Sequence, residues 1–247
     1  MSLSTKKIII VLPVYNEEKV LQENTLKVYN FCQENLVNYD WQILIANNGS
    51  TDKTEEIAQK LTQDFLRISY FYLKEPGRGM ALKKAWSKYK ADVYVYMDID
   101  LATDLKHLPF LISTIDEEQF DLSTGSRLVR GAHVKRSILR DLTSKVYNLL
   151  LKIFFLKYNI KDSQCGFKAI SNKTKEKILP SIKNNKWFFD TELLVRSFYN
   201  GYKIKEIPVE WREERFIKRK STVKMMQTIW DDIKEIFRLK KELLFKK

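Results

Sequence analysis

Two aspartates two positions apart end an apolar run in the first half of the chain. Asp98 and Asp100 follow Val93–Met97, whose β-branched and aromatic residues predict a buried strand. Alternate residues of a strand point to one face, so both carboxylates could converge on a divalent cation that bridges a diphosphate. Such triplets also arise by chance. A solvated strand end that caps the next helix therefore stays open as the alternative.

A second candidate segment follows the first apolar run of the chain. In Leu12-Pro-Val-Tyr-Asn-Glu-Glu, the ring of Tyr15 could stack on a base, and Glu17 could accept a hydrogen bond from a ribose hydroxyl. The same residues fit a structural account in which Pro13 ends the strand, Asn16 caps a helix and the glutamates favour the positive end of its dipole. The residues alone leave both accounts open.

The elements that must position these residues alternate between short strands and longer helices. Strands are expected at 6–12, 41–46, 68–73 and 93–97, and helices at 17–35, 54–65, 81–89 and 105–115. This alternation predicts an α/β fold with a mostly parallel central sheet flanked by helices. Parallel sheets bind ligands beyond the carboxyl ends of their strands. One edge of the sheet is therefore expected to gather the segments 13–17, 47–52, 75–79 and 98–100.

The second half of the chain is expected to carry two amphipathic helices. A strand at 120–124 precedes a long helix from about 135 to 157, whose apolar residues keep helical spacing. A loop at 162–166, a helix near 189–199, a strand at 203–207 and a basic helix follow. We divide the chain into one domain at 1–221 and an amphipathic C-terminal helix at 222–247.

Composition and charge narrow the class of protein. The 247 residues include 44 Lys and Arg against 31 Asp and Glu, and the net charge of +13 favours nucleic acid, anionic lipid or phosphorylated small molecules as partners. Cys32 and Cys165 belong to no paired motif, which fits a reducing cytoplasm. Neither a signal peptide nor a transmembrane helix is expected. His107 and His133 are expected to have surface roles rather than catalytic ones, and Trp187 and Trp211 are expected to be core or interface residues.

Several segments, taken in this order and spacing, resemble the family 2 glycosyltransferases with a GT-A fold, and above all their polyprenyl-phosphate branch, which includes dolichyl-phosphate glucosyltransferase. They are Leu12-Pro-Val-Tyr-Asn-Glu-Glu, Asn47-Asn-Gly-Ser-Thr-Asp, Arg78-Gly-Met-Ala, Asp98-Ile-Asp-Leu-Ala-Thr, Gly125-Ser-Arg, Asp162-Ser-Gln-Cys-Gly-Phe-Lys, Trp187-Phe-Phe-Asp-Thr-Glu-Leu-Leu and Glu206-Ile-Pro-Val-Glu-Trp. The resemblance extends to about Ser221. It implies an inverting, metal-dependent transfer of a hexose, glucose before mannose, from a nucleotide sugar to a polyprenyl or dolichyl phosphate.

The resemblance also implies roles for individual residues. The base and ribose of a UDP-glucose or GDP-mannose type of donor would be held by Pro13, Tyr15, Glu17 and Asn47, with Arg78 nearby. Mg²⁺ or Mn²⁺ on the diphosphate would be bound by Asp98 and Asp100, and Asp162 would lie beside the reacting sugar. Donor phosphates would contact Arg127 and a basic residue among Arg215, Arg219 and Lys220. The acceptor phosphate would be received by Arg140, Ser144 and Arg219.

Two departures from the family pattern bear on the substrates. Asn47 stands where an aspartate is more usual, which leaves the base open, and Ala102 stands where mannosyl-transferring members often have Gln. One alternative function is a soluble glycosyltransferase that acts on a saccharide hydroxyl, with Asp162, or Asp190 in reserve, as general base. A basic nucleic-acid-binding module is disfavoured because the basic residues are dispersed. The expected location is the cytoplasm, at the cytoplasmic membrane face through the two amphipathic helices.

Overall fold

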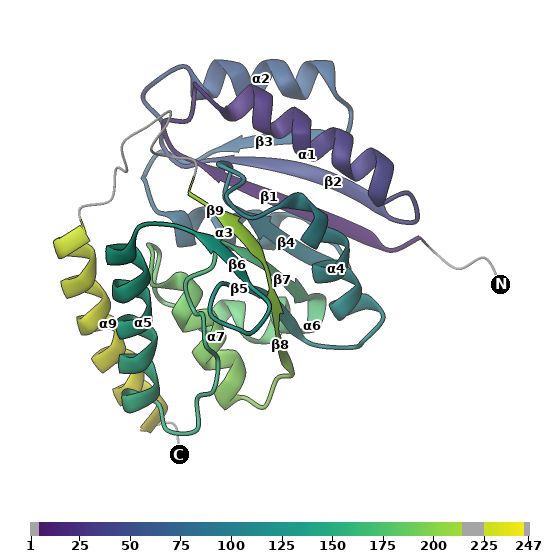
Figure 1. The fold of residues 1–247 in the computed structure, drawn as a ribbon. Coiled ribbons are helices and arrows are strands. Elements are labelled where there is room, and N and C mark those ends of the chain that lie inside the picture. The colour runs from purple at the N-terminus through teal and green to yellow at the C-terminus, as the bar shows by residue number, and fades with distance from the viewer. Residues whose placement is uncertain (1–4, 214–224, 245–247) are drawn as a thin grey trace.

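A seven-stranded sheet forms the centre of the computed structural model, which describes residues 5–213 and 225–244, with side chains in the last stretch from Trp230 onward (Figure 1). The strand order is β3-β2-β1-β4-β7-β5-β8. The strands are β1 (Lys7–Val14), β2 (Asp40–Asn47), β3 (Ile68–Tyr72), β4 (Val93–Met97), β5 (Leu122–Ser126), β7 (Phe167–Ser171) and β8 (Ile204–Pro208). Only β7 runs antiparallel to its neighbours β4 and β5 in this sheet. The predicted α/β fold with a mostly parallel sheet is confirmed.

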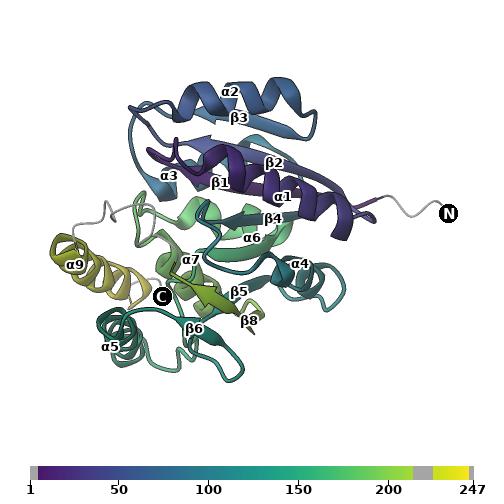
Figure 2. The same ribbon diagram turned by 45° about the horizontal axis from the view of Figure 1, so that its top comes forward.

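Helices cover both faces of the sheet (Figure 2). Along β1, Ile8 and Ile10 face one apolar core and Ile9 and Val11 face the other, which is why the strand is apolar throughout. The first core lies under α1 (Leu21–Asn35), α2 (Thr54–Asp64) and α4 (Leu108–Asp116), which the short η1 (Leu105–His107) precedes. The second core lies under α3 (Arg78–Lys88), α7 (Phe189–Tyr199) and the short helices α6 (Asn172–Lys177) and η2 (Leu179–Ser181).

Two elements differ from the sequence-based expectation in an informative way. The first helix begins at Leu21 rather than at residue 17, and Asn16 is not its cap. Asn16 has a φ of 55° and accepts a hydrogen bond from the backbone N–H of Thr51, so the segment after β1 is joined to the loop after β2 instead. The strand β7 was not anticipated, because the fully buried Lys168 interrupts its apolar pattern.

Two long helices pack side by side at one end of the molecule in both Figure 1 and Figure 2, namely α5 (Ile138–Phe154) and α9 (Met225–Leu244). The helix α5 is shorter than expected because Ser137 caps it and the preceding residues form β6 (His133–Lys135), which pairs with β9 (Glu210–Arg212). No helix in the described part of the chain is long and apolar enough to span a bilayer. The expected boundary between residues 221 and 222 lies outside the described residues and stays a prediction.

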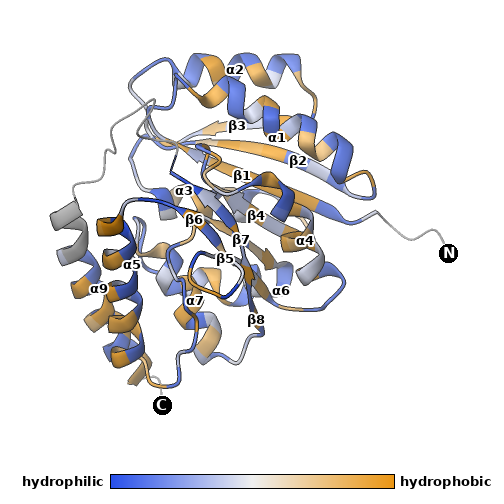
Figure 3. Cartoon of the chain, viewed as in Figure 1, coloured by the Kyte–Doolittle hydropathy of each residue, from blue (hydrophilic) through white to orange (hydrophobic). Residues whose placement is uncertain are grey.

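Buried ion pairs attach α9 to α7. Glu192 is fully buried and accepts hydrogen bonds from Arg196, at 2.6 Å, and from Arg238 of α9, at 2.9 Å. Arg196 also pairs with Glu242 of α9 at 2.6 Å. These contacts hold α9 in place beside α5, and both long helices carry many apolar residues, coloured orange in Figure 3. The exposed apolar residues are Ile138, Leu139, Leu142, Val146, Leu149 and Ile153 on α5, and Trp230, Phe237 and Leu244 on α9.

Candidate active site

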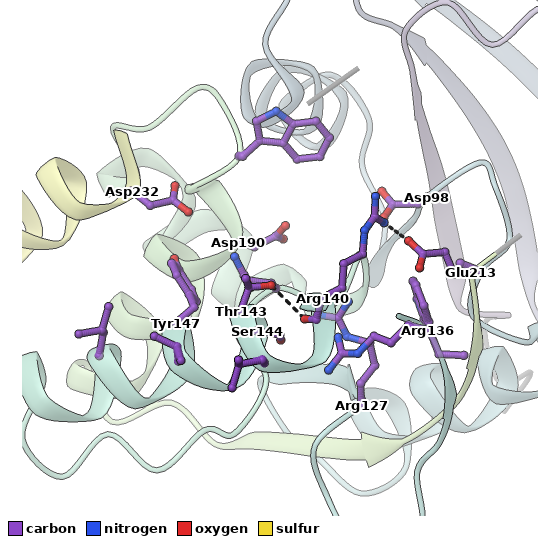
Figure 4. A pocket seen from close by; sticks show the side chains of 18 of the residues that line it. Asp98, Arg127, Arg136, Arg140, Thr143, Ser144, Tyr147, Asp190, Glu213 and Asp232 are labelled. Carbon is purple, nitrogen blue, oxygen red and sulfur yellow. Dashed lines mark hydrogen bonds and ion pairs between the residues drawn. The ribbon is translucent and has the colours of Figure 1, made fainter. Parts of the chain in front are cut away.

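A cavity of about 550 Å³ lies between the carboxyl ends of β4 and β5 and the two long helices (Figure 4). Its end near the sheet is charged, and its wall along the helices is apolar. That wall consists of Leu142, Val146 and Leu150 from α5 and Ile233 and Ile236 from α9. Asp232 of α9 faces the cavity among these apolar groups, and burial raises its pKa to about 7. The cavity therefore suits an elongated ligand with one charged end.

Asp98 and Asp100 both line the cavity, but for a different reason from the one the sequence suggested. The strand β4 ends at Met97, so the two aspartates lie in a turn and not on one face of a strand. The backbone N–H of Asp98 donates to the carbonyl of Gly166 at 3.0 Å. A Cβ on Gly166 would lie 1.9 Å from Oδ2 of Asp98, so residue 166 has to be glycine for this carboxylate to fit.

A buried network of charges links Asp98 to the helix α7. The Arg78 guanidinium donates to Asp98 at 2.8 Å and to Asp190 at 2.5 Å. Asp190 also accepts a hydrogen bond from the hydroxyl of Tyr96 and lies 3.4 Å from the ammonium of Lys168. Burial lowers the pKa of Lys168 to about 8 and raises that of Asp190, an effect that the adjacent Arg78 opposes. Arg78 is thus held between two carboxylates.

Arg127 and Asp162 form a second buried pair. The side chain of Arg127 donates to both oxygens of Asp162, at 2.7 and 2.9 Å, and its backbone N–H donates at 2.9 Å. These contacts outweigh the effect of burial and lower the pKa of Asp162 to about 2. Arg127 lines the cavity, whereas the Asp162 carboxylate lies behind it and is fully buried. This geometry favours a role for Asp162 in positioning Arg127.

Three arginines gather at the charged end of the cavity, as Figure 4 shows for Arg127, Arg136 and Arg140. Sequence reasoning missed Arg136, whose only signal was its place just before the helix cap Ser137. Ser144 lies one turn along α5 from Arg140, and its buried hydroxyl has no hydrogen-bond partner among the described residues. Trp211, expected as a core or interface residue, packs against the first core and also lines the cavity, with its ring 5.6 Å from the Arg127 guanidinium carbon.

Trp187 lies on the opposite wall of the cavity. It was expected as a core or interface residue; it is 44% exposed, lines the cavity, and has its ring 5.2 Å from the Arg78 guanidinium carbon. The ring of His107 is structural, because its Nε2 accepts a hydrogen bond from the backbone N–H of Glu210 at 2.9 Å. Cys165 is fully buried, as expected of a small packed residue.

Pro13 and Asn47 lie at the carboxyl ends of β1 and β2, and Tyr15 and Glu17 lie on the loop after β1; all four are outside the lining of the cavity. The loops after β1 and β2 are joined by hydrogen bonds from the backbone of residues 16 and 17 to the hydroxyls of Ser50 and Thr54. Asn47 is fully buried, and its Oδ1 accepts from the backbone N–H of Ser50 at 3.0 Å. Its Nδ2 has no partner in the described part of the chain.

The predicted site residues thus fall into two groups on one edge of the sheet. Around the cavity the structure brings together Arg78, Asp98, Asp100, Arg127, Arg140 and Ser144. The predicted base-binding and ribose-binding residues form the adjoining loops. Arg215, Arg219 and Lys220 lie outside the described residues. Within residues 5–213 and 230–244, no group of three or more His, Cys, Asp or Glu side chains is arranged to hold a metal by itself.

Comparisons with known proteins fit this architecture. A family model described as glycosyl transferase family 2 matches residues 9–179. Glycosyltransferase AglD of Haloferax volcanii is 37% identical over 204 residues, which are 82% of this chain and 32% of that protein. Dolichyl-phosphate beta-glucosyltransferase of Saccharomyces cerevisiae is 29% identical over 223 residues, which are 83% of this chain and 66% of that protein. The chain thus spans about a third of the first relative and just under two thirds of the second.

Among solved structures, the fold resembles glucosyl-3-phosphoglycerate synthase from Mycobacterium tuberculosis. The complex of that protein with Mn²⁺, uridine diphosphate and phosphoglyceric acid has a TM-score of 0.69 and 16% sequence identity. The match covers 96% of this chain and 78% of that one. This likeness establishes the shared fold.

Proposed function

The chain belongs to glycosyl transferase family 2, and we propose that it transfers a hexose, glucose before mannose, from a nucleotide sugar to a polyprenyl phosphate with inversion at the sugar. One observation carries the proposal, namely a cavity that has three arginines at one end and an apolar wall along two helices. The similarity to dolichyl-phosphate beta-glucosyltransferases supports the choice of sugar and acceptor.

The two ends of the cavity match the two parts of a polyprenyl phosphate. Arg140 and the Ser144 hydroxyl would bind this phosphate, and Arg127 beside them would contact the donor phosphates, since charge-assisted hydrogen bonds from arginine suit phosphate oxygens. The isoprenoid chain would lie along Val146, Leu150 and the facing residues of α9. A saccharide acceptor would find few polar partners on this wall, which makes the rival function less favourable.

Asp98 and Asp100 are the residues that would hold a divalent cation. Mg²⁺ is commonly bound by one or two carboxylates together with substrate phosphates, and Mn²⁺ accepts similar oxygen ligands, so two aspartates without a third protein ligand fit such an ion. When bound, it would supply positive charge at the diphosphate leaving group. Arg78 contacts Asp98 and so would orient this carboxylate from the side of the sheet.

The proposed reaction needs no strong general base. A phosphate monoester has a second pKa near 6 and is largely a dianion at neutral pH. One of its oxygens would form the new bond to the anomeric carbon, while the bond from that carbon to the diphosphate oxygen breaks and the electron pair leaves with the nucleoside diphosphate. Asp162 and Asp190 are both held by arginines, which supports positioning roles for them rather than proton transfer.

The loops after β1 and β2 would hold the nucleoside. Tyr15 would stack on the base, with Pro13 beside it, and Glu17 would accept from a ribose hydroxyl. The Asn47 Nδ2 group supports a base that offers a carbonyl oxygen, since it is a buried donor without a hydrogen-bond partner among the described residues. We also propose that the exposed apolar residues of α5 and α9 rest on a membrane surface at the cytoplasmic face, from which the lipid enters the cavity.

The test is a transfer assay with purified protein, Mn²⁺ or Mg²⁺, and labelled UDP-glucose or GDP-mannose. We expect transfer to a short polyprenyl phosphate and none to the free polyprenol, with kcat/KM rising through about pH 6 as the acceptor becomes a dianion. EDTA is expected to abolish transfer. Equal rates with the free alcohol, or a preference for an oligosaccharide, would replace this function with the saccharide-hydroxyl alternative.

A further inference from the structure

A carboxylate lies inside the anion-binding end of the cavity. Glu213 follows β9 and lines the cavity together with the three arginines. One oxygen of Glu213, Oε1, contacts the Arg140 guanidinium directly, as Figure 4 shows. Arg140 is the arginine that we assign to the acceptor phosphate. An acid in that position repels an incoming phosphate, so its presence in a phosphate site calls for an explanation.

The Arg140–Glu213 contact is built differently from a structural ion pair. Asp162 accepts hydrogen bonds from Arg127 on both of its oxygens, so the buried charge is satisfied. Glu213 is also buried, with 4% of its side chain exposed, but its second oxygen has no hydrogen-bond partner among the described residues. A buried carboxylate with an unsatisfied oxygen is costly to keep. Glu213 is therefore easier to displace than Asp162.

A second polar group near Glu213, the hydroxyl of Ser144, also lacks a hydrogen-bond partner among the described residues. This hydroxyl is buried and lines the same cavity. A phosphate at Arg140 could accept from this hydroxyl, whereas Glu213 already meets Arg140 and leaves the hydroxyl unsatisfied. The partially satisfied state of both groups points to a ligand that takes the place of the carboxylate.

We propose that Glu213 occupies the position of the acceptor phosphate at Arg140 and has to be displaced by it. This inference rests on the proposed function, because it takes the acceptor to be a phosphate monoester. A dianion brings enough charge to replace the carboxylate on the guanidinium. A neutral alcohol brings none and leaves the pair intact. Glu213 thus makes acceptor binding depend on the charge of the acceptor.

The experiment measures binding of geranyl phosphate and of geraniol by calorimetry to the wild type, Glu213→Gln and Glu210→Gln. The amide keeps the shape of the side chain and removes its charge. We expect Glu213→Gln to bind geranyl phosphate at least about tenfold more tightly, because a repulsive charge beside the phosphate is lost. Binding of geraniol is expected to stay unchanged. Glu210→Gln is the matched control, since Glu210 lies on β9 three residues before Glu213 but pairs with Lys106 away from the cavity.

A second comparison tests whether the effect passes through Arg140. In an Arg140→Gln background, the additional Glu213→Gln change is expected to give a much smaller gain in affinity for geranyl phosphate than in the wild type, because the competing ion pair is already absent. Equal or weaker phosphate binding by Glu213→Gln would overturn the inference, as would a parallel gain for geraniol.

The inference and the proposed function can fail separately. If Glu213→Gln binds geranyl phosphate more tightly but no nucleotide sugar supports transfer, the competition stands and the proposed function fails. If transfer to a polyprenyl phosphate proceeds and both proteins bind the phosphate equally, the function stands and the competition is wrong. If neither protein binds geranyl phosphate, both are wrong.

Discussion

The edge of the sheet and the pair of long helices differ in what they bury and what they expose. At the sheet edge, charged side chains such as Arg78, Asp190 and Lys168 are buried and paired with one another. On α5, apolar side chains such as Leu149 and Ile153 are 58% and 60% exposed. Burying charge holds a few side chains in fixed positions at a stability cost, and exposing apolar surface is favourable only when a partner covers it. The first region is suited to chemistry and the second to docking.

The largest expected effect separates the two regions by function. Asp98→Ala is expected to lower transfer at least about a hundredfold, because it removes a carboxylate that we propose to bind the metal ion on the donor diphosphate. Binding to anionic liposomes should not change. Asp92→Ala is the matched control. Asp92 immediately precedes β4, at the end of that strand far from the cavity, and accepts a hydrogen bond from the backbone N–H of Lys7. Wild-type transfer by Asp98→Ala, or activity that survives EDTA, would refute the metal assignment.

A second variant tests whether burial of charge is what makes the sheet edge rigid. Asp162→Asn is expected to lower the free energy of unfolding by about 3 kcal/mol, because Arg127 loses its buried partner. Asp40→Asn removes the partner of Arg67 in an ion pair whose side chains are 44% and 57% exposed, and should cost at most about 0.5 kcal/mol. Urea unfolding of the two variants measures the contrast, and equal losses would remove the distinction.

The pH dependence of the same pair has a definite sign. The pKa of Asp162 in the folded protein is about 2, below its ordinary value of 3.8. A lowered carboxyl pKa stabilises the fold at pH values above 3.8, and this stabilisation is lost as the pH falls towards 2. Unfolding followed between pH 2 and pH 7 should therefore show a steeper acid limb for the wild type than for Asp162→Asn. If the unfolding free energies of the two proteins changed in parallel with pH, the lowered pKa of Asp162 would be contradicted.

A smaller effect, on membrane binding, is expected from acidic residues introduced on the exposed apolar side of α5. Leu149→Glu combined with Ile153→Glu should weaken binding to anionic liposomes by about tenfold or more, because apolar insertion is lost and acidic charge is added. Stability should change by no more than about 0.5 kcal/mol per site, since both side chains are already exposed. Val37→Glu provides the control, as Val37 is 72% exposed in a loop away from this face. Co-sedimentation that is unaffected by the double variant would remove the docking role.

The smallest effect concerns one basic residue on α5. Lys152→Gln should weaken liposome binding by about 1 kcal/mol, roughly fivefold, at low salt and much less at high salt. Lys84→Gln on the exposed side of α3 is the control and should leave binding unchanged. A loss that persists at high salt would mean that Lys152 acts through packing and not through charge.

Local patterns in the sequence were enough for the fold class and for most elements. The β4 range 93–97 and the α7 range 189–199 match their predictions, because a short apolar run and a helical segment are both encoded by near neighbours in the sequence. The short polar segments after the strands were also expected to gather at one edge of the sheet, as they do, since parallel strands end together there.

Contacts between distant residues were decided only by the tertiary structure. The Arg78–Asp190 pair spans 112 positions, and the Arg140–Glu213 pair spans 73. No local period reports such contacts, so neither pair was predicted. The amphipathic pattern of α5 predicted a helix with an apolar side that could meet a membrane, but it did not say which apolar residues would stay exposed, because that depends on which surfaces the sheet has left to cover. The sequence by itself determined which residues could do chemistry, and long-range packing determined which of them meet.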